Sequence, residues 1–406
     1  MSRAVASNRL VTDGFDGTWA ELGAIDLPPA AAAFCAGHRE ALRAVWQHAT
    51  HPGTELLVAS AGRKEEGLVA ALSELGLAIV DLDGDDIAIA PAAAPRDPLP
   101  GRVWLLTSGS TGRPKQVAHT LDSLTTVKGE QPARTWLCPY TPGAYAWWQV
   151  TTLGLFQPGQ KVVYVDPAHA EDWPLVARAH GVDAASGTPT FWRQALMRHG
   201  DVLAEVGFTQ ITLGGEPVDQ AILDLLHASF PGARVSWIYA SSEAGASIAV
   251  HDGRAGFPTA WLDRADEGRP RLFVEDGELV IESPFRGEGI QARLRTGDRA
   301  EIRDDRVLIT GRLASDEINV GGSKVSASTV REVLQSHPGV LWAEVKGRKA
   351  PVVGTLVQAS VVLRDDAVTE AELAQYCDAR LDSYAVPRRF RFLTEIPLKE
   401  SLKSDV

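Results

Sequence analysis

Residues 107–115 read TSGSTGRPK and combine hydroxyl side chains, two glycines and a terminal lysine. The apolar run 104–106 precedes them, so the pattern predicts a strand that enters a loop. Small residues of this kind let backbone amides and hydroxyls close around phosphate oxygens. The hydroxyl donors would be Thr107, Ser108, Ser110 and Thr111, and Gly109 and Gly112 would give the backbone its freedom.

The same stretch departs from the common phosphate-binding loop, in which a lysine follows glycine directly and a hydroxyl residue follows the lysine. Here Pro114 precedes Lys115, and Gln116 follows it. Taken alone, the stretch is therefore consistent with either a phosphate-binding loop or an ordinary polar turn.

Alternating strands and helices follow this stretch and would position the loops between them. We predict strands with their turns at 160–167, 183–190, 209–217 and 234–245, and helices at 173–181, 191–200 and 220–232. Before the stretch, the alanine-rich residues 28–48 have helical spacing, 55–62 and 65–76 read as strand and helix, and 89–101 read as a surface connector. The alternation predicts largely parallel sheets with ligand loops at the carboxyl ends of the strands.

The pattern changes near residue 270. Residues 271–283 and 299–312 each show the signal of a β-hairpin. The remaining chain mixes predicted helices at 328–337 and 370–381 with strands at 342–347, 357–363 and 389–394. We therefore predict an α/β protein with a large domain over 1–312, which includes a β-rich segment, and a small mobile α+β domain over 313–406.

Composition narrows the possible partners. The 406 residues carry a formal net charge of -12, which argues against nucleic acid or an anionic membrane as the main partner. Three distant cysteines, Cys35, Cys138 and Cys377, predict neither a disulfide framework nor a zinc site. The sequence begins without the apolar core of a signal peptide, and no apolar run approaches membrane-spanning length. A soluble, cytoplasmic protein is expected.

Four more stretches join the first: YASSE (239–243), RTGD (295–298), GRLASDEINVGGSKV (311–325) and IPLKESLK (396–403). In this order, and with LGGEP (213–217) between them, they resemble the adenylate-forming superfamily of acyl-CoA synthetases, peptide-synthetase adenylation domains and luciferases. The resemblance implies an enzyme in which a carboxylate attacks the α-phosphorus of ATP. Pyrophosphate leaves, and a thiol then displaces AMP from the acyl-adenylate.

The resemblance assigns roles around ATP. Lys115 would face the leaving pyrophosphate, Tyr239 would pack on the adenine, and Asp298 would accept both ribose hydroxyls. Arg312 would reach the same ribose-phosphate region. The turn Gly214, Gly215 and Glu216 would flank the adenine and the acyl pocket, with Ala240 beside Tyr239 where the family usually has glycine.

The catalytic groups implied by the resemblance are Ser242, Glu243 and Lys403. Ser242 would bond an α-phosphate oxygen, Glu243 would hold Mg²⁺, and the Lys403 ammonium would bridge the α-phosphate and the attacking carboxylate. Leu402 stands where the family has glycine, and Lys399 is the alternative to Lys403.

Two further regions of the family are a hinge and a tunnel for the thiol. The hinge stretch is one residue longer here, and Asp316 is its best match, while Gly321 and Gly322 match the strand that lines the tunnel. In the family the small domain rotates at this hinge between the two half-reactions.

The acyl pocket is expected to hold Gly215 and the aromatic residues Tyr145, Trp147 and Trp148, although either tryptophan could instead fill the core. The segment Gly143-Ala144-Tyr145 lacks the carboxylate of the amino-acid-activating branch, which favours an aryl or other carboxylate without an α-ammonium.

The segment before the phosphate loop is short, as in compact members such as o-succinylbenzoate ligases. The thiol acceptor could accordingly be coenzyme A or the phosphopantetheine arm of an acyl carrier protein. Two alternatives stay open: an adenylating enzyme with a non-thiol acceptor or a non-carboxylate substrate, and a non-catalytic nucleotide-binding relative.

Overall fold

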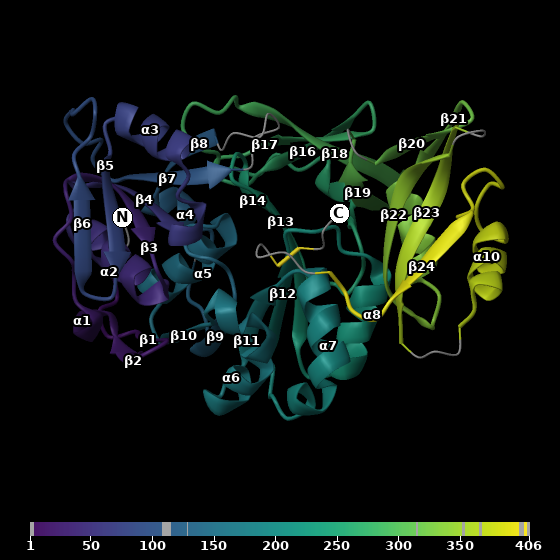
Figure 1. Cartoon of the computed structure of the whole chain (residues 1–406), viewed down its shortest axis with the longest axis horizontal. Helices are drawn as coiled ribbons and strands as arrows, with labels where there is room; N and C mark the ends of the chain where they lie inside the picture. Colours follow the sequence, from purple (N-terminus) through teal and green to yellow (C-terminus); the bar gives the residue numbers. More distant parts are fainter. Residues whose placement is uncertain are drawn as a thin grey trace.

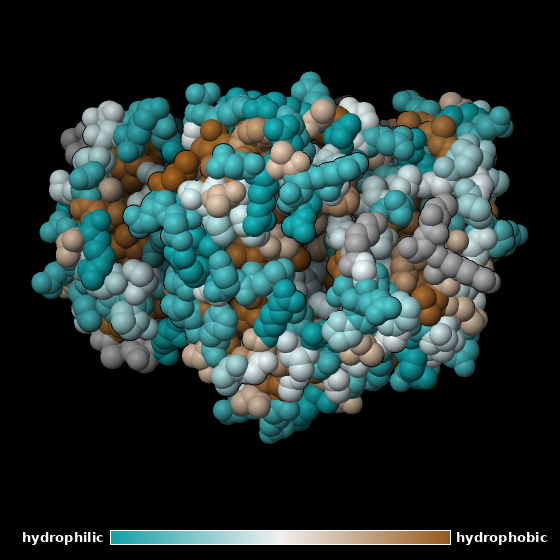
Figure 2. Space-filling view, turned by 180° about the vertical axis from the view of Figure 1, so that it is seen from behind, coloured by the Kyte–Doolittle hydropathy of each residue, from teal (hydrophilic) through white to brown (hydrophobic). Residues whose placement is uncertain are grey.

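Figure 1 shows the computed structural model of the chain, with the two mixed sheets on the left and centre and the C-terminal unit on the right. The structure describes residues 4–107, 115–127, 129–313, 316–350, 354–364, 368–397 and 402–403. Figure 2, from behind, shows hydrophilic residues spread over the surface with apolar residues between them, as expected of a protein with 23% charged residues.

A six-stranded sheet lies in the N-terminal part. Its spatial order is β6 (Asp86–Ala90), β5 (Ala78–Asp83), β3 (Ala30–Cys35), β4 (Glu55–Ser60), β7 (Arg102–Thr107) and β8 (Lys115–Thr120). The four central strands are parallel, whereas β6 and β8 are antiparallel edges. Helix α3 (Glu66–Glu74) packs on one face, and α2 (His38–Thr50) on the other.

The alanine-rich segment corrects one sequence expectation. Residues 28–48 were predicted to be helical throughout, but the structure places strand β3 before helix α2. Strand β3 pairs with β4 on one side and β5 on the other, and every one of its residues is buried. Burial on both faces therefore outweighs the helical propensity of alanine.

An eight-stranded sheet forms the centre of the molecule. Its order is β14 (Gly245–Val250), β13 (Arg234–Ser241), β12 (Gln210–Gly214), β11 (Ala184–Gly187), β9 (Arg134–Cys138), β10 (Gln160–Tyr164), β1 (Arg9–Thr12) and β2 (Phe15–Thr18). The strands from β13 to β1 are parallel. Its helices are α1 (Trp19–Leu22), α4 (Leu121–Leu124), α5 (Tyr145–Phe156), α6 (Trp173–Ala179), α7 (Pro189–Ala204) and α8 (Gln220–Ser229).

The helices that flank the central strands begin at well-formed caps. The Thr188 hydroxyl accepts from the Phe191 amide at the start of α7, where Pro189 occupies the first turn. The Asp219 carboxylate accepts from the Ile222 amide at the start of α8. These caps fix the loops that leave β11 and β12, and both loops reach the cavity described below.

An antiparallel sheet covers the carboxyl ends of these strands. It consists of β15 (Phe257–Pro258), β19 (Arg306–Arg312), β18 (Arg293–Arg303), β17 (Glu278–Glu282) and β16 (Arg271–Glu275). The turn between β16 and β17 has Asp276 and Gly277 at φ 53° and 74°, the left-handed geometry that a D-G hairpin requires. Both predicted hairpins are present.

The C-terminal unit has its own core. A hairpin of β20 (Glu317–Val320) and β21 (Ser323–Ser326) leads into α9 (Ala327–Gln335). Then β22 (Val340–Ala350), β23 (Gly354–Leu363) and β24 (Arg389–Leu393) form a three-stranded sheet, with α10 (Glu370–Asp378) after β23. The buried core of this unit consists of residues between Ile318 and Phe390. It is separate from the core of the large unit, which extends along the chain to Val307 and also includes Leu402.

A small apolar cluster joins the two units. Leu341, Trp342, Val362 and Ile396 of the C-terminal region pack with Met197 of α7 and Leu225 of α8. Trp342 is 2% exposed. The predicted fold class, mostly parallel α/β sheets followed by a small α+β unit, is confirmed by this arrangement.

Candidate active site

A cavity of about 810 Å³ opens between the large unit and the C-terminal unit. The loop after β12 and the end of β13 line one side, and strands β18 and β19 line another; Ser242 and Glu243, in the turn after β13, lie just outside the lining. Residues of α9, β20 and β22 close it from the C-terminal unit, and Lys403 projects into it. A site at the carboxyl ends of parallel strands is the usual place for a ligand in such sheets.

Tyr239, Asp298 and Arg312 meet in this cavity from three different strands. The Tyr239 hydroxyl donates to Asp298 Oδ2 at 2.5 Å, and Arg312 Nε lies 3.2 Å from Asp298 Oδ1. Asp298 and Arg312 are direct cross-strand neighbours on β18 and β19, which fixes their pairing. Burial raises the pKa of Asp298 above its usual value, although Tyr239 and Arg312 both favour the carboxylate.

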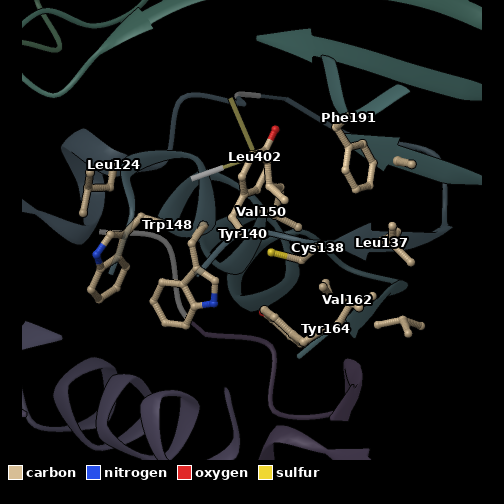
Figure 3. Packing of buried hydrophobic residues seen from close by; sticks show 14 of the residues in the cluster. Leu124, Leu137, Cys138, Tyr140, Trp148, Val150, Val162, Tyr164, Phe191 and Leu402 are labelled. Atoms are coloured by element: carbon tan, nitrogen blue, oxygen red, sulfur yellow. The ribbon is translucent and has the colours of Figure 1, made fainter. Parts of the chain in front are cut away.

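Lys403 enters the cavity from the C-terminal tail. A Cβ atom built on Gly215 would lie 3.3 Å from Lys403 Cε and 3.9 Å from Nζ, so the lysine stem runs along this glycine. The preceding Leu402 is 3% exposed within the large core, shown in Figure 3, and its carbonyl oxygen accepts from the Thr188 hydroxyl. Burial lowers the pKa of Lys403, and the negative charge of Glu216 opposes this shift.

Gly214 ends β12, and Gly215 and Glu216 form the bend that follows it. Gly215 has φ +82°, a left-handed conformation that suits glycine, and a side chain there would also press against Lys403. Glu216 Oε2 accepts from the Thr190 amide at 2.9 Å and so ties this turn to the first turn of α7. Gly215, Glu216 and Ala240 all line the cavity.

Ser242 and Glu243 lie in a turn between β13 and β14. The Glu243 carbonyl oxygen accepts from the Gly287 amide at 2.9 Å, and the Ala244 amide donates to Ser241 Oγ at 3.0 Å. The described residues show no ion pair of the Glu243 carboxylate and no group of three or more acidic, histidine or cysteine residues that could enclose a metal. One uncommitted carboxylate fits Mg²⁺, which usually takes one or two protein carboxylates together with substrate phosphates.

The predicted phosphate loop is bounded by two paired residues. Thr107 ends β7 and Lys115 begins β8, and the two are register partners. The Thr107 hydroxyl oxygen is buried and has no hydrogen-bond partner among the described residues, so it is suited to a ligand oxygen. Ser108, Gly109, Ser110, Thr111 and Gly112 lie outside the described residues, as does Lys399.

The two tryptophans predicted for the acyl pocket belong to the core. Trp147 and Trp148 are both 0% exposed, and neither lines the cavity. Trp147 Nε1 donates to His38 Nδ1 at 3.1 Å, and Figure 3 shows Trp148 among other apolar core residues. Both residues lie in the first turn of α5 and are buried between the two mixed sheets. We therefore assign them to packing. Tyr145, at the start of α5, does not line this cavity either, and its part in an acyl pocket stays a prediction.

Asp316, the predicted hinge residue, is 6% exposed and densely bonded. Its carboxylate accepts from the Ser326 hydroxyl at 2.7 Å and from the Ser328 amide and hydroxyl at 2.6 and 2.8 Å. Arg299 Nε lies 3.5 Å away. Gly321 and Gly322, proposed for the thiol tunnel, form the tip of the β20–β21 hairpin with φ 59° and 94°.

Family comparison agrees with the order of these features. Residues 25–289 match the family model of AMP-binding enzymes, and residues 330–403 match the model of the C-terminal domain of AMP-binding enzymes. The chain belongs to the AMP-binding enzyme family. The resemblance to adenylate-forming enzymes seen in the sequence is thereby confirmed.

Individual relatives of this AMP-binding enzyme are more distant. A 2-succinylbenzoate–CoA ligase of Bacillus cytotoxicus is 27% identical over 267 residues, which cover 60% of this chain and 55% of that protein. A long-chain-fatty-acid–CoA ligase of Mycobacterium tuberculosis is 25% identical over 323 residues, with 72% and 64% covered. The match therefore spans somewhat over half the length of these relatives.

Solved structures show that the fold is shared across nearly the whole chain. An anthranilate CoA ligase in complex with anthranoyl-AMP superposes with a TM-score of 0.75 at 15% identity, covering 99% of this chain and 93% of that one. An amide bond synthetase from Marinactinospora thermotolerans gives a TM-score of 0.68 at 20% identity, covering 100% and 96%.

Several residues of the AMP-binding enzyme's site were missed in the sequence. Thr188 holds the Leu402 carbonyl, while Ser326, Ser328 and Arg299 surround the Asp316 carboxylate. His119 contacts the Ser242 carbonyl at 2.7 Å. These residues act through contacts between distant segments, and their residue types alone carried no signal. His119 lies four residues after Lys115, just beyond the predicted phosphate loop.

Proposed function

We propose that this protein activates a carboxylic acid with ATP and transfers the acyl group to a thiol. The proposal assigns residues 1–312 to ATP and acid binding and residues 313–406 to a mobile unit that carries Lys403. The observation that carries it is the convergence of Tyr239, Asp298, Arg312 and Lys403 on one cavity from segments far apart in the chain.

In the first half-reaction, an oxygen of the substrate carboxylate attacks the α-phosphorus, the bond to the bridging oxygen of the β-phosphate breaks, and pyrophosphate leaves. Negative charge develops on the α-phosphate oxygens, and the Lys403 ammonium, which lines the cavity, would stabilise it. Thr107 and Lys115 would contact the departing phosphates. Mg²⁺, when bound by Glu243, would neutralise phosphate charge.

The ribose of ATP would be bound by Asp298. Its carboxylate offers two acceptor oxygens, and Tyr239 and Arg312 hold it in place from both sides. The Tyr239 ring would then pack on the adenine, next to the Gly215 turn. Ser242, in the turn after β13, would donate to an α-phosphate oxygen.

The acid we propose is an aryl or other carboxylate without an α-ammonium. Positions 143–145 carry no carboxylate that could pair with the α-ammonium of an amino acid. The 2-succinylbenzoate ligase and the anthranilate ligase to which the chain is similar are named for acids of this aryl class, which supports the proposal.

The thiol acceptor we propose is coenzyme A, with the phosphopantetheine arm of a carrier protein as the alternative acceptor. Support comes from the CoA ligases among the relatives. In the second half-reaction the thiol sulfur would attack the acyl carbonyl of the acyl-adenylate and expel AMP. The small unit would rotate at Asp316 and bring Gly321 and Gly322 to the thiol.

Acid-dependent ATP–pyrophosphate exchange tests the first half-reaction over a panel of aryl and aliphatic acids. We expect exchange with at least one aryl acid. Formation of AMP with coenzyme A, a pantetheinylated carrier protein or an amine then identifies the acceptor. Absence of acid-dependent exchange across the panel, with ATP still bound, would refute the catalytic proposal.

Among the described residues, none of the helices has both the length and the apolar character needed to span a membrane.

A further inference from the structure

His119 is a buried histidine beside the catalytic turn that the mechanism above does not use. It lies on β8, the strand that leaves the phosphate loop, and is 1% exposed. Its Nε2 lies 2.7 Å from the Ser242 carbonyl oxygen, and its Nδ1 lies 3.0 Å from Ser123 Oγ. The side chain therefore connects the strand after the phosphate loop with the turn that carries Ser242 and Glu243.

The direction of these hydrogen bonds follows from their partners. A carbonyl oxygen only accepts, so Nε2 must carry a proton and donate to Ser242. Burial lowers the pKa of His119, which favours the neutral ring. In the neutral ring Nδ1 is an acceptor that faces the Ser123 hydroxyl of α4, and this hydroxyl accepts from the Thr120 amide and also lies 3.0 Å from the Thr120 carbonyl oxygen. The Ser242 carbonyl therefore sets the tautomer.

The two peptide groups that flank Glu243 are held by β8 and by the loop at Gly287, which is itself bonded to β8. The peptide before Glu243 is bound through its carbonyl by His119. The peptide after it is bound through its carbonyl by the Gly287 amide, and the neighbouring Glu288 amide donates to the Ala118 carbonyl at 2.8 Å. A Cβ atom at Gly287 would lie 2.4 Å from Val117 Cγ1, so only glycine permits this close approach to β8.

A side chain leaves its Cα in a direction that the two adjacent peptide planes determine. Anchoring both planes therefore fixes the direction in which the Glu243 side chain leaves its Cα, and anchoring the first plane also constrains that direction for Ser242. Catalytic groups must be held to within fractions of an ångström, and a displacement of about 1 Å can lower a rate about 100-fold.

We propose that His119 is a positioning residue for the adenylation half-reaction. Its Nε2 donor holds the peptide between Ser242 and Glu243 so that both side chains meet the nucleotide. This inference rests on the proposed function, because it assigns a task to the same turn. It predicts that a donor at the Nε2 position is required, rather than an imidazole as such.

The test compares His119→Leu, which removes the donor, with His119→Gln, whose amide nitrogen can occupy the Nε2 position. The matched control is the same pair of substitutions at His48. His48 is also buried, at 3% exposure, and burial also lowers its pKa, to about 4, but it bonds Thr54 far from the cavity. Pyrophosphate exchange, calorimetric binding of ATP with Mg²⁺, and thermal unfolding are measured for all four variants.

We expect His119→Leu to lower the exchange rate about 10- to 100-fold and to weaken binding of ATP with Mg²⁺. His119→Gln should recover most of both, and the His48 variants should unfold at lower temperature with exchange and nucleotide binding near wild type. Equal exchange and binding in the Leu and Gln variants at His119 would overturn the proposal. So would losses in the His48 variants as large as those in His119→Leu.

The outcomes separate this inference from the proposed function. If the wild-type protein shows no acid-dependent exchange but binds ATP with Mg²⁺, the catalytic proposal fails. The binding measurements then decide on His119 alone: weaker binding in His119→Leu and recovery in His119→Gln support positioning. Unchanged binding in His119→Leu contradicts it.

Discussion

Replacing Lys403 with methionine would remove the charge that we propose for the transition state while keeping most of the alkyl stem. The stem runs along Gly215, and Leu402 anchors the tail in the core of the large unit. Methionine retains that packing, so the loss should report on the ammonium. Binding of ATP should change little, because the charge on the α-phosphate oxygens grows only as the reaction proceeds.

The size of the expected rate loss follows from the charges, their separation and the effective dielectric constant. Two unit charges about 4 Å apart interact by about 4 kcal/mol at an effective dielectric constant of about 20. Since each 1.36 kcal/mol corresponds to a factor of about ten in rate, the exchange rate should fall about 10³-fold. Removal of a single preorganised donor from an oxyanion site costs about 10²- to 10³-fold, which is of the same order.

Acid-dependent pyrophosphate exchange measures the rate, and calorimetry measures the affinity for ATP. Lys346→Met is the matched control, because Lys346 lines the same cavity from the C-terminal unit but pairs with Glu344. We expect its exchange rate to stay near wild type. Retention of exchange within about tenfold in Lys403→Met would refute the role of this lysine, provided that the variant unfolds at the wild-type temperature.

Three more predictions follow from the same cavity. Asp298→Asn should weaken ATP binding by about 10²- to 10⁴-fold in calorimetry, since hydrogen bonds to a charged group contribute about 1.5–3 kcal/mol each and two are affected; affinity within about threefold of wild type would contradict the ribose assignment. Asp316→Asn should lower the free energy of unfolding of the C-terminal unit by about 1–3 kcal/mol in a denaturant titration, because an amide cannot accept all the hydrogen bonds from Ser326 and Ser328; unchanged stability would show that these bonds are dispensable. Burial lowers the pKa of Lys403 from 10.5, so exchange should decline with rising pH before the ordinary lysine value is reached. The unfolded chain then holds this proton more tightly than the folded one, so the contribution of Lys403 to stability rises with pH. Lys403→Arg should remove the alkaline decline of exchange, because arginine stays protonated.

Much of the fold was predictable because the chain repeats simple periodicities. The strands at β10, β12 and β13 are apolar runs between helices, and burial in a parallel sheet requires that pattern. Strand β3 was not predicted, because its local sequence pattern is not that of a strand. Its alanines favour a helix locally, and only the neighbours β4 and β5 make them a strand.

The site divides along a similar line. Asp298 and Lys403 could be found from the sequence because each stands in a short motif of fixed spacing. Trp147 and Trp148 were ambiguous, because a helix next to a pocket and a helix inside a core carry the same aromatic residues. His119 could not be assigned, since its partner Ser242 is more than a hundred positions away and contributes only a backbone oxygen.

The apolar cluster between the units has a thermodynamic consequence for the proposed rotation. Leaving the present orientation would uncover Trp342 from Met197 and Leu225. Exposing about 200 Å² of apolar surface raises the heat capacity by about 0.1 kcal/mol/K. Because such contacts weaken on cooling, the balance between the two orientations should depend on temperature, with the small unit released more readily in the cold.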